Sequence, residues 1–364
     1  MTIMAIHPWH RARAAQLFAR AATLPHALLV HGPAGIGKRA FAAHVAARLL
    51  CDAPRVPGES GACGACRGCR LFAACTHPDL HVVEPEAGAA MNRDLLDVYA
   101  QKYVPEKKGD RKPSAVVRID QIRELVDAIR LRPQISAWRV TMLLPAESIN
   151  VNAANSFLKI LEEPPSDTLI MLVTAVPGRL PATIRSRCVP LPLSTPSRSD
   201  ALAWMRDVAP DIAGAETSLA LAGGAPLLAL SYARTNEAGF ATGLADDLCA
   251  LATRRRDLGA CAARWKEQGA EISLSWLETV IAEVIRARAA PDAARRLPPH
   301  APLQRIAERL HSTELHAFYD RVSRGRVLSG GPLDEQLLIE DILVAWLDLT
   351  DTPTKSLITR SLNR

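Results

Sequence analysis

The sequence predicts a parallel α/β domain in its first half and helices alone in its second half. Two observations carry this prediction. Between residues 27 and 173, short apolar runs alternate with helical patterns, as in strands joined by crossover helices. Beyond the proline-rich stretch at 190–199 no further strand pattern occurs, and abundant Ala and Leu favour helices. At 364 residues, the chain is long enough for two or three domains.

The first half contains four candidate strands, which are residues 27–30, 80–83, 140–144 and 169–173. Three helices are predicted between them, at residues 37–50, 118–131 and 150–163. Pro164 and Pro165 end the last of these helices. The order of strand, helix, strand and helix predicts an open, doubly wound sheet.

Two stretches interrupt this pattern. Charged residues crowd among Gly and Pro at 85–115, where we expect a surface insertion with some disorder. Prolines and serines after residue 189 indicate a linker. We therefore expect a sheet domain at 1–192, a small helical domain at 193–236 and an all-helical domain at 237–364.

Composition limits the classes of function. The formal net charge of +6 allows a polyanionic partner without requiring one, and an aromatic content of 4% argues against gripping single strands by base stacking. No apolar run is long enough for a signal peptide or a membrane span, so we expect a cytoplasmic protein. Cysteines are normally reduced there, and clustered ones indicate metal ligands before disulfides.

A glycine-rich loop follows the first predicted strand and opens a helix, with the sequence GPAGIGKR at residues 32–39. Backbone N–H groups in such a loop line a concavity for phosphate, and the helix N-terminus adds positive potential. Lys38 would reach the β- and γ-phosphates of a nucleotide. The candidate nucleotide-binding residues are Gly32, Gly35, Gly37 and Lys38.

The side chains that would bind a catalytic magnesium ion are missing from their usual positions in this sequence. Arg39 stands where such loops carry a Ser or Thr hydroxyl that binds Mg²⁺. The strand at 140–144 runs into Pro145 and Ala146, and Glu147 would need an altered turn to reach the metal. We therefore expect no ATP hydrolysis in this chain's own site, while ATP binding stays open.

A cysteine knuckle lies in the first crossover. Cys63, Cys66 and Cys69 are spaced three apart, with Cys51 upstream, and four thiolates suit a closed, structural Zn²⁺ site. Cys51 is the favoured fourth ligand, and Cys75 or His77 are the alternatives. An iron–sulfur site would want a cysteine three residues after Cys69 and then a proline, which the sequence lacks.

Three stretches carry a family resemblance. The first is the glycine loop and helix followed by the cysteine knuckle and Thr76-His77-Pro78-Asp79; the second is NAANSFLKILEEPP at 152–165; the third is TAVPGRLPATIRSRC at 174–188. With these motifs, residues 7–192 resemble the bacterial clamp-loader subunits of the AAA+ family. The helical remainder is similar only in general character.

The resemblance implies an AAA+ P-loop domain with a zinc-binding insertion, a small helical lid domain and an all-α collar domain. The motor subunits gamma and tau have a Ser or Thr at the position of Arg39 and an acidic residue at the end of the strand that corresponds to 140–144. This chain lacks both, so it resembles a non-motor subunit. Arg187 would be an arginine finger acting on ATP in a neighbouring motor subunit, and Thr174 would occupy the sensor 1 position. No arginine occurs at the sensor 2 position near 223–227.

The implied partners are the gamma or tau and delta subunits and, through the complex, the sliding clamp and primed DNA, with no membrane. Three other readings remain open. An active clamp-loader ATPase would show Mg²⁺-dependent turnover, and a zinc-organised DNA-binding module would show salt-sensitive DNA affinity. A nucleotide kinase gains no support from the knuckle or from the Ser-Arg-Cys motif.

Overall fold

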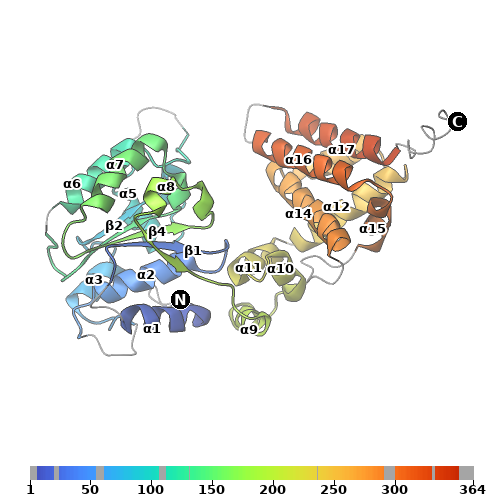
Figure 1. The fold of residues 1–364 in the computed structure, drawn as a ribbon. Coiled ribbons are helices and arrows are strands. Elements are labelled where there is room, and N and C mark those ends of the chain that lie inside the picture. Colours follow the sequence, from blue (N-terminus) through green and yellow to red (C-terminus); the bar gives the residue numbers. More distant parts are fainter. Residues whose placement is uncertain are drawn as a thin grey trace. The chain divides into compact units, whose positions relative to one another are not determined.

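The computed structural model describes residues 6–19, 24–54, 61–105, 112–130, 132–235, 237–290, 300–329 and 333–351. The chain divides into two compact units, Met1–Asp200 and Ala201–Arg364. The first unit contains the sheet, and the described part of the second unit is helical (Figure 1). No helix in these ranges is both long and apolar enough to cross a lipid bilayer.

The sheet has five parallel strands in the order β2-β3-β4-β1-β5. These are β1 (Ala27–His31), β2 (Leu80–Val83), β3 (Arg139–Leu143), β4 (Thr168–Thr174) and β5 (Val189–Pro192). The four predicted strands are present. The interpretation of Pro190 as the start of the linker was wrong, because β5 is an edge strand, where a missing backbone N–H is tolerated.

Helices cover both faces of the sheet (Figure 1). Helices α6 (Ile119–Ile129), α7 (Val151–Glu162) and α8 (Ala182–Arg185) share a core with one side of the strands, and α2 (Lys38–Leu49) packs on the opposite side. The connections that leave β1 and β4 therefore start on opposite faces, although these strands are neighbours. The carboxyl ends of β1 and β4 form the topological switch point, where α/β sheets bind ligands.

The remaining helical elements of this unit are short. They are η1 (Pro8–His10), α1 (Arg11–Ala19), α3 (Arg67–Ala73), α4 (Glu86–Ala89), α5 (Leu95–Gln101), η3 (Ala146–Ser148) and η4 (Pro177–Arg179). The prediction of a partly disordered surface insertion was wrong for residues 86–103. Helix α5 contacts β2, and its Leu96 and Tyr99 are buried. Residues 106–111, where much of the charge lies, are outside the described ranges.

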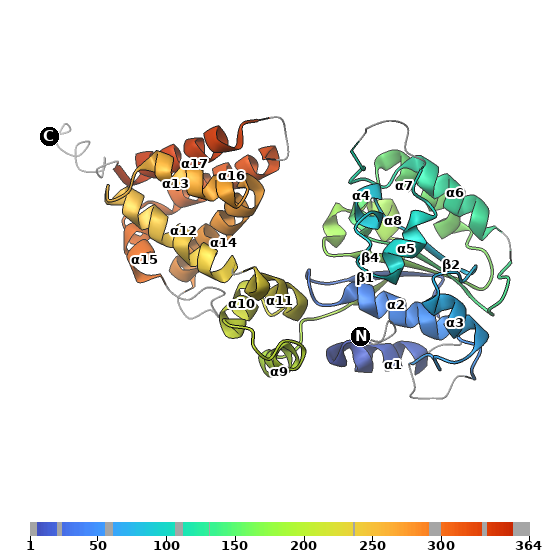
Figure 2. The ribbon, with the colours of Figure 1, turned by 180° about the vertical axis from the view of Figure 1, so that it is seen from behind.

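The second unit, seen from behind in Figure 2, is a stack of helices. They are α10 (Ala215–Leu221), α11 (Pro226–Arg234), α12 (Glu237–Ala252), α13 (Leu258–Glu267), α14 (Ala270–Ala289), α15 (Ala301–Glu308), α16 (Ser312–Leu328) and α17 (Glu335–Asp351). Helix α9 (Arg198–Val208) begins in the first unit and continues into this one. Trp265 and Trp346 are fully buried in the core of the stack. A boundary between lid and collar at residue 236 remains a prediction.

Candidate functional site

The glycine loop lies at the switch point, directly after β1. Gly32, Gly35 and Gly37 have positive φ angles of 155°, 72° and 93°. A Cβ on Gly32 would meet the Leu193 carbonyl at 2.2 Å, and one on Gly37 would meet the ring of His7 at 2.3 Å. Both positions therefore require glycine for space as well as for conformation.

The N-terminal segment braces this loop from behind. Trp9 Nε1 donates a hydrogen bond to the Ile36 carbonyl (3.0 Å), and His10 Nε2 lies 2.8 Å from the same oxygen. The His7 ring stacks on Trp9 with 4.8 Å between centroids. Burial, with help from the charge of nearby His10, lowers the pKa of His7 to about 4. The sequence reasoning missed this brace, although three ring side chains within four residues were a usable signal.

Lys38 folds back over its own loop. Its Nζ donates to the carbonyl oxygens of Gly32 (2.8 Å) and Pro33 (2.6 Å). Burial lowers the pKa of Lys38, and the charge of Glu147 opposes that shift. A phosphate in the loop would have to compete with these two carbonyls for the ammonium group.

Arg39 is held by three carboxylates. Its Nε and Nη2 donate to Asp94 at 2.6 and 2.8 Å, Nη2 also donates to Asp97 at 2.5 Å, and Nη1 pairs with Glu84. Glu84 and Asp97 are buried. Although burial alone would lower the pKa of Arg39, the three carboxylates raise it overall. Burial raises the pKa of Glu84 to about 7, and Arg39 partly offsets this shift. The guanidinium thus fills the neighbourhood in which a hydroxyl would bind magnesium.

Two further residues lie towards the loop. Thr174 ends β4, pairs in register with His31 of β1 and is buried; its Oγ1 accepts a hydrogen bond from the Val176 N–H (2.9 Å). Glu147 lies in η3, and its Oε2 is buried without a hydrogen-bond partner among the described residues. The negative charge of Glu147 opposes the lowering of the Lys38 pKa, so the carboxylate lies within electrostatic range of the loop lysine.

Arg187 lies at the other end of the sheet. Val189 pairs with Leu28, so Arg187 precedes the start of β1, whereas Gly32 follows its end. Val189 lies two residues after Arg187, and the four strand positions from its partner Leu28 to Gly32 correspond to roughly 13 Å at about 3.3 Å per residue. The Arg187 side chain is 36% exposed, and it contacts the Thr183 carbonyl through Nη1 (2.9 Å) and Glu162 Oε1 through Nη2 (2.6 Å). Arg187 cannot reach its own glycine loop from there.

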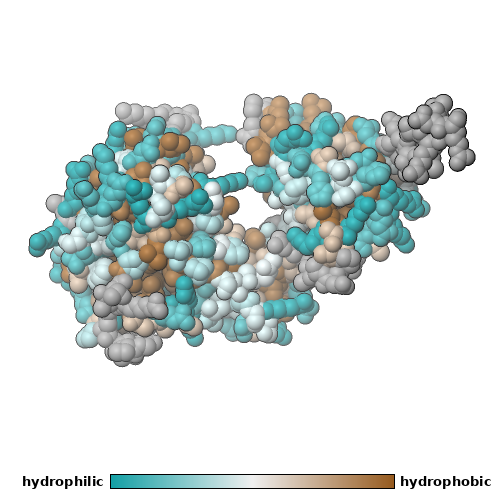
Figure 3. All heavy atoms as spheres, in the orientation of Figure 1, coloured by the Kyte–Doolittle hydropathy of each residue, from teal (hydrophilic) through white to brown (hydrophobic). Residues whose placement is uncertain are grey.

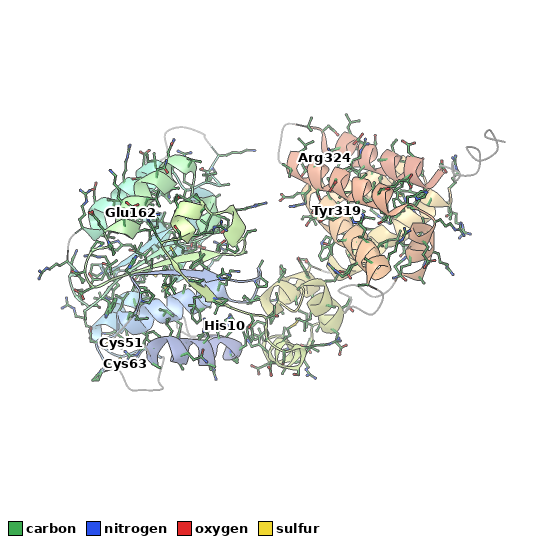
Figure 4. The ribbon with its side chains drawn as sticks, in the orientation of Figure 1. His10, Cys51, Cys63, Glu162, Tyr319 and Arg324 are labelled. Carbon is green, nitrogen blue, oxygen red and sulfur yellow. The ribbon has the colours of Figure 1, made fainter. Side chains whose placement is uncertain are left out.

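The structure brings Cys51, Cys63, Cys66 and Cys69 together, with all four Sγ atoms within 4.8 Å of one another. Cys51 and Cys63 are labelled in Figure 4. The Cys63–Cys69 and Cys66–Cys51 Sγ separations are 3.9 and 3.8 Å. A tetrahedral ion with Zn–S bonds near 2.3 Å requires about 3.8 Å between sulfurs, so the cluster fits zinc. Backbone N–H groups of Ala65 and Cys66 lower the pKa of Cys63 to about 6, whereas burial raises the pKa of Cys51 and of Cys69.

The two alternative ligands lie elsewhere. Cys75 Sγ points at the Leu95 carbonyl (3.9 Å). His77 accepts from the Asp79 N–H through Nδ1 (3.2 Å) and contacts Ser136 through Nε2 (3.1 Å). The described cluster therefore consists of the four cysteines alone.

A parallel sheet with a glycine loop at its switch point, a four-cysteine knuckle in its first crossover and a helical C-terminal unit defines an AAA+ protein of the clamp-loader class. Residues 12–197 match the family model described as DNA polymerase III, delta subunit, and residues 243–348 match the model for its C-terminal part. The chain belongs to the DNA polymerase III subunit delta' family.

Relatives cover nearly the whole chain. It is 33% identical to DNA polymerase III subunit delta' of Pseudomonas aeruginosa, over 94% of this chain and 98% of that one. Identity to the Escherichia coli subunit delta' is 28%, over 93% and 94% of the two chains. Among solved structures, a gamma subunit-related protein of Thermotoga maritima gives a TM-score of 0.40 at 15% identity, covering 93% of this chain and 99% of that one.

Proposed function

We propose that this chain is a non-motor subunit of the clamp loader that lends Arg187 to ATP bound by a neighbouring motor subunit. The observation that carries the proposal is the place of Arg187, partly exposed at the end of the sheet opposite its own glycine loop. A guanidinium there can act only on a phosphate supplied by another chain. Arginine fingers of this kind stabilise the charge that develops on the transferring phosphoryl group.

The chain's own loop supports this division of labour. Lys38 donates to two carbonyls with which a phosphate would have to compete, and Arg39 is paired with three carboxylates. Arg39 also offers no oxygen ligand. We infer that the loop does not hydrolyse ATP and that any nucleotide bound there serves no turnover.

One observation favours the alternative of an active ATPase. Glu147 Oε2 is buried without a hydrogen-bond partner among the described residues, and its charge raises the pKa of Lys38, as expected of a carboxylate that could assist a metal near the loop. Mg²⁺-dependent ATP hydrolysis by the purified chain, abolished in Glu147→Gln, would establish that alternative. The non-motor proposal expects no turnover in either protein.

The knuckle would hold a structural zinc ion through Cys51, Cys63, Cys66 and Cys69. Four thiolates leave no coordination position for water, so the ion would stabilise the first crossover connection and would have no catalytic role. The Gly68 N–H donates to Asp52 Oδ2 (3.1 Å), which ties the knuckle to the residues after α2. Zinc would therefore steady the helix that begins at the glycine loop.

The partners are the gamma or tau and delta subunits and, through the assembled complex in the cytoplasm, the sliding clamp and primed DNA. A surface for such contacts lies where α16 meets α17. Five apolar side chains are exposed on these two helices and just before α17: Val327, Leu328, Leu333, Leu337 and Val344. We call this set the apolar strip; Figure 3 shows hydrophobic atoms at that end of the second unit.

The test is ATP hydrolysis by the complex rebuilt with motor and delta subunits, clamp and primed DNA. Replacing Arg187→Ala should slow the neighbouring site by about 10³-fold or more, so total turnover falls by that site's share. The complex should still assemble on a sizing column, because Arg187 is only one surface side chain. An unchanged rate with Arg187→Ala would refute the trans-acting finger.

A further inference from the structure

The contacts of Arg187 single out a second residue. Glu162 forms an ion pair with Arg187, with 2.6 Å between Oε1 and Nη2, and the Thr183 carbonyl accepts a hydrogen bond from Nη1 at 2.9 Å. Arg185 lies two residues earlier, and it makes no ion pair with any residue that the structure describes. Arg187 is thus set apart from its neighbour by these two contacts.

Glu162 is fixed in space by the helix that carries it. It is the last residue of α7, and its neighbours Ile160 and Leu161 are buried in the core between α7 and the sheet. Helix α7 also contacts α8, the element just before Arg187. The carboxylate therefore stands at the end of a helix that is anchored in the core; Glu162 is labelled in Figure 4.

The guanidinium keeps donors to spare. It carries five N–H donors, of which the Thr183 carbonyl uses one on Nη1, while Nη2 faces Glu162 in the ion pair. The other N–H groups can bind oxygens of a phosphate while Glu162 and Thr183 hold the opposite side. An arginine held in this way has already lost rotamer freedom, which a free surface arginine would lose only on meeting its target.

Resting on the function proposed above, we propose that Glu162 is a positioning residue for the arginine finger, which it holds ready for the γ-phosphate of the neighbouring subunit. It touches no nucleotide itself. Its contribution is to the geometry of Arg187 in the transition state, so its loss should lower kcat and leave KM for ATP unchanged.

The experiment uses the complete complex with clamp and primed DNA. Glu162→Gln should lower the Arg187-dependent part of ATP turnover about threefold to tenfold, since misplaced catalytic groups lose rate steeply. Glu163→Gln is the matched control, because Glu163 is the next residue, is exposed and makes no ion pair among the described residues. It should leave turnover unchanged. Glu162→Asp, which keeps the charge, should recover part of the rate.

The double variant Glu162→Gln with Arg187→Ala decides how Glu162 acts. If Glu162 works through Arg187, the double variant is no slower than Arg187→Ala alone. Equal slowing on both backgrounds, an unchanged rate or a faster rate with Glu162→Gln would overturn the positioning role. If Arg187→Ala has no effect, the proposed function fails as well; if only Glu162→Gln has none, the finger stands and this inference fails.

Discussion

Arg39 shows how one side chain can change the use of a phosphate loop. Its positive charge is neutralised by three carboxylates, two of which, Glu84 and Asp97, are buried. Buried carboxylates are tolerated only while they keep such a partner. Arg39 therefore contributes to the stability of the fold, whereas a motor subunit carries at the same position a Ser or Thr whose hydroxyl binds magnesium for catalysis.

Removing this partner should be costly. Arg39→Ala leaves Glu84 and Asp97 with Arg93 as their remaining partner, and we expect the free energy of unfolding to fall by about 3 kcal/mol. Urea denaturation of the isolated chain measures this. Arg123→Ala, which breaks an exposed pair with Asp120, should cost about 1 kcal/mol or less. Equal losses in the two variants would contradict a buried role for the Arg39 cluster.

His7 should make stability depend on pH. Its folded pKa is about 4 against an ordinary value of 6.5, so the unfolded chain binds the proton first as pH falls. Its contribution is present above pH 6.5 and is lost as pH falls to 4, amounting to about 3 kcal/mol. His7→Phe keeps a ring against Trp9 and should flatten this loss in urea titrations across that window. Exposed His316→Gln should leave the loss as in the wild type.

The sequence alone allows the prediction of those site residues that form a local pattern. Gly32, Gly35, Gly37 and Lys38 form one motif, and the cysteines recur at short spacing. The role of Glu162 could not be predicted in this way, because Glu162 and Arg187 are 25 positions apart in the sequence and come into contact only in the folded domain. The partners of Arg39 lie 45 to 58 residues away and were out of reach for the same reason.

Among the elements, strands were predicted where their composition matched their burial. The strands β1, β3 and β4 are buried along most of their length, and buried parallel strands appear in the sequence as continuous apolar runs. Strand β5 alternates Val and Leu with Pro, and three of its four residues are exposed, so its composition indicates a linker. Helix α5 was missed because charged residues flank its short apolar face.

The knuckle gives a prediction about an element. A Cβ on Gly68 would meet the Leu50 carbonyl at 2.1 Å, while a Cβ on Gly61 would have nothing within 4 Å. Gly68→Ala should displace α3 from the end of α2, destabilise the chain by about 1–3 kcal/mol and weaken zinc retention. Gly61→Ala should do neither. Zinc released to a colorimetric chelator under increasing competition measures retention, and equal release from both variants would contradict the packing argument.

At the scale of the whole molecule, the apolar strip should matter only on assembly. Leu337 is 67% exposed, so Leu337→Glu should leave the thermal midpoint of the isolated chain nearly unchanged. The same change buries a charge if a partner subunit covers the strip, and binding should weaken by at least about tenfold. Sedimentation with the motor and delta subunits measures this, with exposed Val151→Glu as the control. Undiminished assembly would show that the partners dock elsewhere.

The tight approach of Gly32 to the Leu193 carbonyl has a mechanical consequence. Leu193 is the first residue after β5, where the chain leaves the sheet towards the helices, and its N–H also donates to the His31 carbonyl (2.8 Å). A displacement of Gly32 would therefore first meet the carbonyl group of Leu193. In a subunit that hydrolyses ATP, the same contact would pass a movement of the phosphate loop on to the segment that follows the last strand. Here Lys38 and Arg39 are both held by contacts within the first unit, so we expect the contact between Gly32 and Leu193 to stay unchanged.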